Sequence, residues 1–325
     1  MASLNGGRVT VAGAGALGLC IALELARRGT AVTVCDPAPV GDNASGVAAG
    51  MLAPVFESVL DPDGGGDLDF LRAARDLWPA FADVPIDRSG AVYRGDSGSA
   101  VRERLDALGA DWRETPDGPF SPEDWRLDPG AVMTRLYAMA GRAGVTFEDR
   151  AVSADDTGLL VLATGANAAG PAPELARLTP IKGHILRVAG GPQTGPVLRA
   201  EGVYLCPDPA AAVLGATMEP GLDDRRVDPG QAARLLALGE RLWPGISALR
   251  VRAEVGVRAA TPDGLPMVGW SATPNVLLAV GARRNGWLLA PLVARTIAAY
   301  LADEDPGPHA ARLDPRRFDD KETRA

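Results

Sequence analysis

The stretch RVTVAGAGALGLCIALELARRGTAVTVCD, residues 8–36, decides the fold of this chain. It opens with a short apolar run, residues 8–12, that is typical of a buried strand. Apolar residues then recur at helical spacing over 17–25, and Gly29 offers a helix stop. A second apolar run, 31–35, resembles another buried strand. The stretch therefore predicts a strand, a glycine turn, a helix and a second strand.

The turn contains glycines in the pattern Gly-x-Gly-x-x-Gly. Gly13 permits the tight turn, Gly15 lets the backbone approach a pyrophosphate, and Gly18 lets the helix pack closely on the strand. Asp36 closes the second strand, where a carboxylate can accept hydrogen bonds from an adenosine ribose. A chain with 39 glycines produces such patterns by chance, but strand, helix and acid together favour dinucleotide binding. The residues expected at the dinucleotide are Gly13, Gly15, Ala16, Leu17, Gly18 and Asp36. The motif alone leaves NAD and FAD both open.

The composition points to a small-molecule ligand. The 325 residues include 33 Lys and Arg against 41 Asp and Glu, and a formal charge of −8 disfavours nucleic acid or an anionic membrane as partner. The three cysteines form no CxxC pair and the chain has two histidines, so we expect buried thiols, a reducing cytoplasmic location and no metal site.

The rest of the chain alternates helical and strand patterns. Residues 159–163 resemble a central parallel strand, whereas strand signals dominate from 180 to 216. Another strand pattern at 276–280 precedes a helical pattern at 287–302. This order predicts a parallel sheet assembled from separated segments, with a largely antiparallel unit inserted between them. The charged residues 314–325 are expected to be a solvated tail.

Several separated segments resemble one enzyme family. Residues 44–54, ASGVAAGMLAP, are similar to the flavin-contacting segment of glycine oxidases and related D-amino-acid oxidases. Further segments match the same family in the right order: PIKG at 180–183, YLCP at 204–207 with LGATM at 214–218, GVRAATPDGLPMVG at 256–269, and GARRNGWLLAP at 281–291. The chain therefore resembles an FAD-dependent D-amino-acid oxidase of the glycine oxidase type.

The resemblance implies an α/β fold in which a Rossmann-type FAD-binding domain carries an inserted, mainly antiparallel β (α+β) substrate domain. We expect residues 1–80, 128–172 and 255–325 to form the FAD-binding domain, and 81–127 and 173–254 the substrate domain.

The resemblance also implies which further residues contact the cofactor. These residues are Ala44, Ser45, Ala49, Gly50, Met51, Val152, Gly165, Asn285, Gly286, Trp287, Leu288 and Leu289. We expect dissociable, non-covalent FAD, because no histidine lies near the N-terminal motifs and no cysteine follows Cys206. His184 is expected to be structural.

The family's substrate-binding arginine corresponds to Arg258. A guanidinium can hold an amino-acid carboxylate by two charge-assisted hydrogen bonds; the alternative is an arginine paired to an acid on a strand surface. Tyr204 would add a hydroxyl contact, unless it is a strand tyrosine whose hydroxyl lies in water. Arg284 could be a second carboxylate contact and Met218 an apolar wall, whereas Arg283 is expected to be a surface charge.

The implied reaction is oxidative deamination of glycine or a small D- or N-methyl amino acid. Hydride transfer to flavin gives an imino acid, then a keto acid, with H2O2 as co-product; in this family the reaction can serve thiamine biosynthesis. The alternatives are a D-amino-acid dehydrogenase with an acceptor other than oxygen, an NAD-dependent dehydrogenase, and a catalytically degenerate FAD-binding protein.

Two departures from the family motivate the degenerate alternative. Few residues separate Arg150 from Leu159, where relatives carry a longer strand pair, and Ala166-Asn167 stands where relatives often have a tryptophan. The sequence leaves open which amino acid reacts, which acceptor is used, and whether the chain forms a homo-oligomer.

Overall fold

A computed structural model describes residues 7–61, 67–153, 156 and 158–319. The helices begin and end as follows: α1 Ala16–Arg27, α2 Ala44–Val47, α3 Pro54–Leu60, α4 Leu68–Asp76, α5 Trp78–Phe81, α6 Gly98–Ala107, α7 Pro129–Arg142, α8 Pro229–Leu242, α9 Gly286–Ala302 and α10 Ala310–Leu313, with short 3-10 turns η1 Pro173–Arg177, η2 Ile246–Ala248 and η3 Pro315–Phe318. In the part of the chain that the structure describes, no helix is both long and apolar enough to cross a bilayer.

The first sheet contains the strands that the N-terminal motif predicts. Its order among the described residues is β16-β17-β9-β1-β2-β8. The bounds are β1 Arg8–Ala12, β2 Ala31–Cys35, β8 Thr146–Glu148, β9 Leu159–Leu162, β16 Met267–Trp270 and β17 Val276–Val280. All neighbours are parallel except β16 and β17. The prediction of a central parallel strand at 159–163 is confirmed, because β9 pairs in parallel with both β1 and β17.

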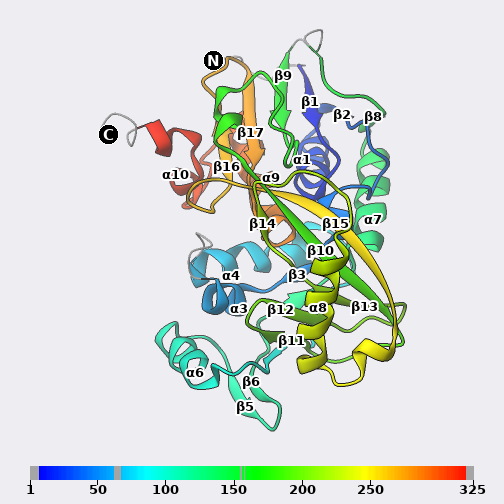
Figure 1. Cartoon of the computed structure of the whole chain (residues 1–325). Coiled ribbons are helices and arrows are strands. Elements are labelled where there is room, and N and C mark those ends of the chain that lie inside the picture. The colour runs from blue at the N-terminus through cyan, green and yellow to red at the C-terminus, as the bar shows by residue number, and fades with distance from the viewer. Residues whose placement is uncertain (1–6, 62–66, 154–155, 157, 320–325) are drawn as a thin grey trace.

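The second sheet is mainly antiparallel and lies below the first in Figure 1. Its order is β14-β10-β13-β12-β11-β4-β6-β5, and β15 pairs with β10. The bounds are β4 Ala91–Tyr93, β5 Arg113–Thr115, β6 Gly118–Ser121, β10 Thr179–Ala189, β11 Val197–Ala200, β12 Val203–Cys206, β13 Ala212–Gly215, β14 Glu219–Pro220 and β15 Arg250–Ala260; β3 Met51–Leu52 and β7 Trp125–Arg126 form a separate pair. The predicted fold class is confirmed, and the domain bounds stay a prediction.

Close packing of α1 on β1 and β9 positions the glycine turn. α1 and α9 pack together over the first sheet, and their buried residues share a core with Val11 and Leu277. A Cβ atom on Gly18 would lie 1.9 Å from the Gly13 carbonyl oxygen. Gly13 has φ +109°, and a Cβ there would lie 2.4 Å from the Ala163 carbonyl oxygen. Both positions therefore require glycine.

The C-terminal residues depart from the expected solvated tail. Pro315 and Phe318 are buried, and Arg317 donates hydrogen bonds to Asp263 at 2.8 and 3.0 Å. The prediction is wrong for η3, because its apolar side chains pack against the first sheet although charged residues surround them in sequence. Residues 320–325 lie outside the described chain.

We expect Gly18→Ala to lower the free energy of unfolding by about 1–3 kcal/mol, because the new methyl group must push α1 away from the turn. Denaturant unfolding measures this difference. Gly141→Ala is the matched control, since Gly141 is also helical but a Cβ atom there would meet nothing within 4 Å; it should stabilise the protein by about 0.5–1 kcal/mol. Equal stability of the Gly18→Ala variant and the wild type would contradict the packing argument.

Candidate active site

A cavity of about 830 Å³ lies along the carboxyl ends of the parallel strands. Its volume is within the range of roughly 300–1,000 Å³ typical of ligand sites. The predicted cofactor residues that line it are Gly13, Gly15, Ala16, Leu17, Asp36, Ala44, Ser45, Val152, Gly165, Gly286 and Trp287. Segments far apart in sequence thus meet where open α/β sheets bind ligands.

The glycine turn presents backbone N–H groups to this cavity. Gly15 caps α1 without a side-chain hydrogen bond, so the first turn of the helix keeps donors for a ligand. The Ala14 amide donates to Asp36 Oδ2 at 2.7 Å, and the Ala16 amide donates to Ser45 Oγ at 3.0 Å. A Cβ on Gly15 would meet only that Oγ, at 3.2 Å. These residues fit the diphosphate and ribose of a dinucleotide.

A second helix N-terminus, that of α9, also faces the cavity. Trp287 donates from Nε1 to the Ser45 carbonyl at 3.0 Å, and Trp78 donates to the Trp287 carbonyl at 2.9 Å. These bonds hold the start of α9 against the α2 segment. Leu288 and Leu289, which the resemblance places at the cofactor, are buried behind this turn and do not line the cavity.

A smaller pocket of about 60 Å³ adjoins the large cavity. Both are lined by Ala44, Ala48, Arg258, Arg284 and Trp287. The structure brings all the predicted substrate residues to the small pocket, namely Tyr204, Met218, Arg258 and Arg284, together with Ala49, Gly50, Met51 and Asn285. A ligand in this pocket would therefore lie directly against a cofactor in the cavity.

Arg258 reaches the pocket from β15. Its Nη1 lies 3.3 Å from the Thr217 carbonyl oxygen and 3.4 Å from Met218 Sδ. None of the ion pairs among the described residues includes it. Burial lowers the pKa of this guanidinium. A Cβ on Gly183 would lie 2.3 Å from Nη1, so the PIKG glycine makes room for the side chain. The alternative of an arginine paired to a surface acid is excluded.

Tyr204 lies beside Arg258 and is buried, with 6% of its surface exposed. A Cβ on Gly215 would lie 2.3 Å from its hydroxyl oxygen, so the glycine of the LGATM segment accommodates the ring. Burial raises the pKa of Tyr204 to about 12. The hydroxyl therefore keeps its proton at neutral pH and can donate a hydrogen bond into the pocket.

A buried charge cluster, which the sequence did not reveal, forms the wall behind Arg284. Glu57 Oε1 lies 2.9 Å from Arg199 Nη2 and 3.3 Å from Arg284 Nη2. Asp61 pairs with Arg284 at 3.5 Å and with Arg283. The prediction of Arg283 as a surface charge is wrong, because this ion pair turns its side chain into the cavity wall.

Glu57 is ionised in this cluster. Its burial opposes ionisation, but Arg284 and Arg199 outweigh that effect and lower the pKa of Glu57. The charge of Glu57 in turn raises the pKa of Arg284. The only sequence signal for Glu57 is an acid within the apolar run that follows residues 44–54; Arg199 stands alone between apolar neighbours and carries no such signal.

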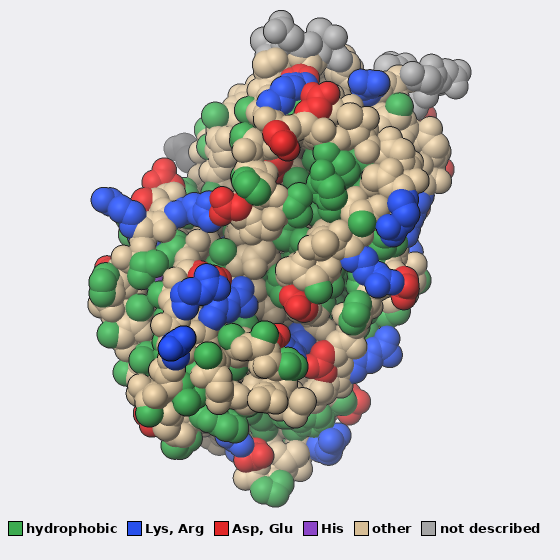
Figure 2. Space-filling model, turned by 90° about the vertical axis from the view of Figure 1, so that its right-hand side faces the viewer, with side chains coloured by type: hydrophobic (Ala, Val, Ile, Leu, Met, Phe, Trp, Pro, Cys, Tyr) green, Lys and Arg blue, Asp and Glu red, His purple; other side chains and the backbone are tan. Residues whose placement is uncertain are grey.

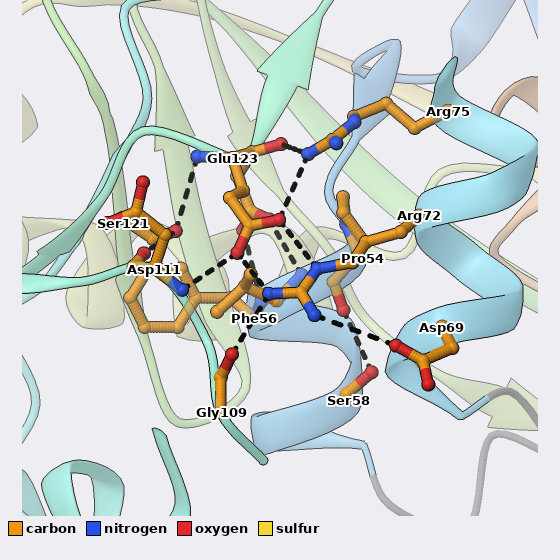
Figure 3. Close-up of polar contacts among 12 residues, drawn as sticks. Pro54, Phe56, Ser58, Asp69, Arg72, Arg75, Gly109, Asp111, Ser121 and Glu123 are labelled. Carbon is orange, nitrogen blue, oxygen red and sulfur yellow. Dashed lines mark hydrogen bonds and ion pairs between the residues drawn. The ribbon is translucent and has the colours of Figure 1, made fainter. Parts of the chain in front are cut away.

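The helix that carries Glu57 is fixed by neighbouring acids. Asp124 accepts hydrogen bonds from the Val55 and Phe56 amides, at 2.8 and 3.0 Å, at the start of α3. The adjacent Glu123 accepts from Arg72 Nε at 2.7 Å and from the Asp111 amide at 2.8 Å. Figure 3 shows Glu123 between Arg72 and Arg75 of α4 on one side and Asp111 on the other. These contacts hold α3 in place against the pocket.

Comparison with known proteins identifies the family. Residues 8–300 match the model of the FAD dependent oxidoreductase family, so the chain belongs to this family. The NAD-dependent alternative is thereby excluded, and the cofactor is FAD.

Individual relatives cover most of the chain. It is 31% identical to a putative thiamine biosynthesis oxidoreductase ThiO of Rhizobium etli, over 93% of this chain and 98% of the relative. It is 26% identical to a glycine oxidase of Bacillus licheniformis, over 90% and 92%. A bifunctional protein ThiO/ThiG of Trichormus variabilis is 31% identical over 95% of this chain, but the chain spans only 55% of that relative's length.

Solved structures share the fold. Glycine oxidase from Geobacillus kaustophilus matches with a TM-score of 0.81 at 24% identity, over 96% of this chain and 99% of that one. An iminodiacetate oxidase from Chelativorans sp. matches with a TM-score of 0.78 at 21% identity, over 95% and 99%. The chain is thus an FAD-dependent oxidoreductase with the architecture of these enzymes.

We expect Glu57→Gln to lower the free energy of unfolding at pH 7 by about 3–5 kcal/mol, because it leaves the buried Arg199 without a charged partner. The folded pKa of Glu57 lies below its usual 4.5, so this stabilisation is present above that pH and is lost as pH falls through the folded value. Urea unfolding at pH 7 and at pH 3 measures both effects. Glu114→Gln, in an exposed pair with Arg102, is the control and should leave the stability nearly unchanged, because solvent screens an exposed ion pair. Equal losses in the two variants would contradict the burial argument.

Proposed function

We propose that this chain oxidises glycine or another small amino acid, D-configured or N-methylated, at the bond between the α-carbon and nitrogen. The observation that carries the proposal is the half-buried Arg258, which no ion pair among the described residues includes and which lies beside Tyr204 in a small pocket that opens into the FAD cavity. A cation that is partly removed from water and has no acidic partner among the described residues favours an anionic ligand, because that ligand compensates its charge.

The volume of the small pocket supports a small substrate. Its 60 Å³ has room for roughly four to six water-sized groups at about 10–15 Å³ each. Glycine fills such a space with its five non-hydrogen atoms, and sarcosine or D-alanine adds one more. The apolar neighbours Ile185 and Met218 offer a methyl group van der Waals contact.

The protein contributes mainly positioning to this reaction. Arg258 and Tyr204 would hold the carboxylate, which orients the α-carbon toward the large cavity. Bound FAD supplies the acceptor for the hydride that leaves the α-carbon. The amine proton passes to water, the resulting imino acid is hydrolysed to the oxo acid, and a primary amine leaves as ammonia. Glu57 is paired with two arginines, so we assign it a role in stabilising the pocket and not the role of a catalytic base.

The names of relatives support a place in thiamine biosynthesis, since one is a putative thiamine biosynthesis oxidoreductase. We therefore propose that the imino acid is used there before water hydrolyses it, and that oxygen reoxidises the non-covalently bound flavin, giving H2O2. The sequence also allows a dehydrogenase that passes electrons to another carrier.

An anaerobic flavin-bleaching screen tests the proposal. Glycine, sarcosine and D-alanine should each be added to the purified protein while the flavin absorbance is followed. We expect at least one to bleach the flavin, with peroxide forming when air is admitted. Bleaching without peroxide would indicate the dehydrogenase, and FAD that no amino acid bleaches would contradict an amino-acid oxidase.

We expect Arg258→Ala to raise KM for the amino acid roughly 10²- to 10³-fold while FAD stays bound, because one charge-assisted contact to a buried carboxylate is lost. Steady-state kinetics and the flavin spectrum measure the two effects. Arg252→Ala is the matched control, since Arg252 lies on the same strand but its side chain is 75% exposed. Unchanged kinetics in Arg258→Ala would refute the assignment.

A further inference from the structure

Arg225 lines the FAD cavity from the side of the second sheet. It lies in the segment 221–228, between β14 and α8, and its guanidinium pairs with Asp42 in the segment that follows β2. Both residues line the large cavity. Both side chains are about half exposed, at 50% and 51%, and ion pairs of this kind are weak. This arginine can therefore exchange its partner at little cost.

The segment that carries Arg225 is held from β10. Lys182, a buried residue of the PIKG motif, binds Asp224 Oδ1 through Nζ at 2.8 Å. His184, fully buried, accepts a hydrogen bond at Nε2 from the Asp228 amide at 2.8 Å. Two side chains of one strand thus fix both sides of the segment and aim Arg225 at the cavity.

Arg225 lies on the phosphate side of the cavity. Its partner Asp42 precedes Asn43, which caps α2, and the next residues of α2 include Ser45, which binds the amide of Ala16 at the start of α1. The other arginines that line the cavity are Arg258, Arg283 and Arg284. Of these, Arg283 and Arg284 are paired with Asp61, and Arg258 also lines the small pocket.

We propose that Arg225 is a cofactor-binding residue that leaves Asp42 and binds the diphosphate of FAD. Backbone amides supply directed hydrogen bonds to a diphosphate, but its two negative charges also attract a cation, and a guanidinium can bind phosphate oxygens bidentately. The second sheet thereby takes part in holding the cofactor, and Lys182 acts as a positioning residue. The inference concerns the cofactor alone and holds for any substrate.

The test measures ligand binding to the full-length apo-protein and FAD release from the holoenzyme. We expect Arg225→Ala to raise the Kd for FAD roughly tenfold and to raise that for ADP to a similar extent, while adenosine binding is unchanged. Asp42→Asn should tighten FAD binding, because it removes the competing carboxylate. Arg226→Ala is the matched control: its side chain is 92% exposed and does not line the cavity. An unchanged Kd for ADP in Arg225→Ala, or an equal loss for adenosine, would overturn the proposal.

A double-mutant comparison tests the positioning role of Lys182. Lys182→Met should speed FAD release in the wild-type background but have no further effect in Arg225→Ala, because its influence passes through Arg225. Lys182→Arg should restore slow release. An effect of Lys182→Met that is equal in both backgrounds would show a general loss of structure and overturn this role.

Discussion

The antiparallel pairing of β10 with β15 is the constraint that positions the site. The two eleven-residue strands pair along their whole length, with Ile181 opposite Arg258 and Gly183 opposite Gly256. Figure 1 shows both strands running from the first sheet's end of the molecule into the second sheet. Because successive side chains alternate between faces, a slip of one residue would turn Arg258 away from the pocket. One register therefore places Arg258, the proposed carboxylate-binding residue, beside Gly183, which makes room for its side chain.

The same strand pair connects the two ligand-binding regions. β10 contributes Gly183 to the pocket, whereas Lys182 and His184 fix the segment that carries Arg225. The small pocket and the large cavity are thus both lined by residues that this strand pair contributes or positions. On the face shown in Figure 2, acidic and basic side chains are interspersed and form no single basic patch, as suits a small-molecule enzyme.

Charge compensation divides the arginines of the site into two groups. Arg199, Arg283 and Arg284 form ion pairs with Glu57 and Asp61, whereas none of the ion pairs among the described residues includes Arg258. The three paired arginines support the wall of the site. Arg258 is the one that we propose binds an anionic ligand. The resemblance implies that Arg284 is a second carboxylate contact. Because Arg284 is paired with Glu57 and Asp61, its position also fits a residue that stabilises the pocket wall. Its contact with the substrate stays a prediction.

Local sequence was sufficient to predict the strand, glycine turn and helix at 8–36, the strands at 159–163 and 276–280, and the FAD family. These depend on local periodicity, on glycine conformation and on short motifs, all of which are contiguous in the chain. The charge cluster and the Arg225 segment, by contrast, emerge only in the folded molecule. Arg199 and Glu57 are 142 residues apart and Arg225 and Asp42 are 183 apart, so neither pair leaves a local pattern. Such contacts arise from strand register and sheet packing, which the whole fold sets.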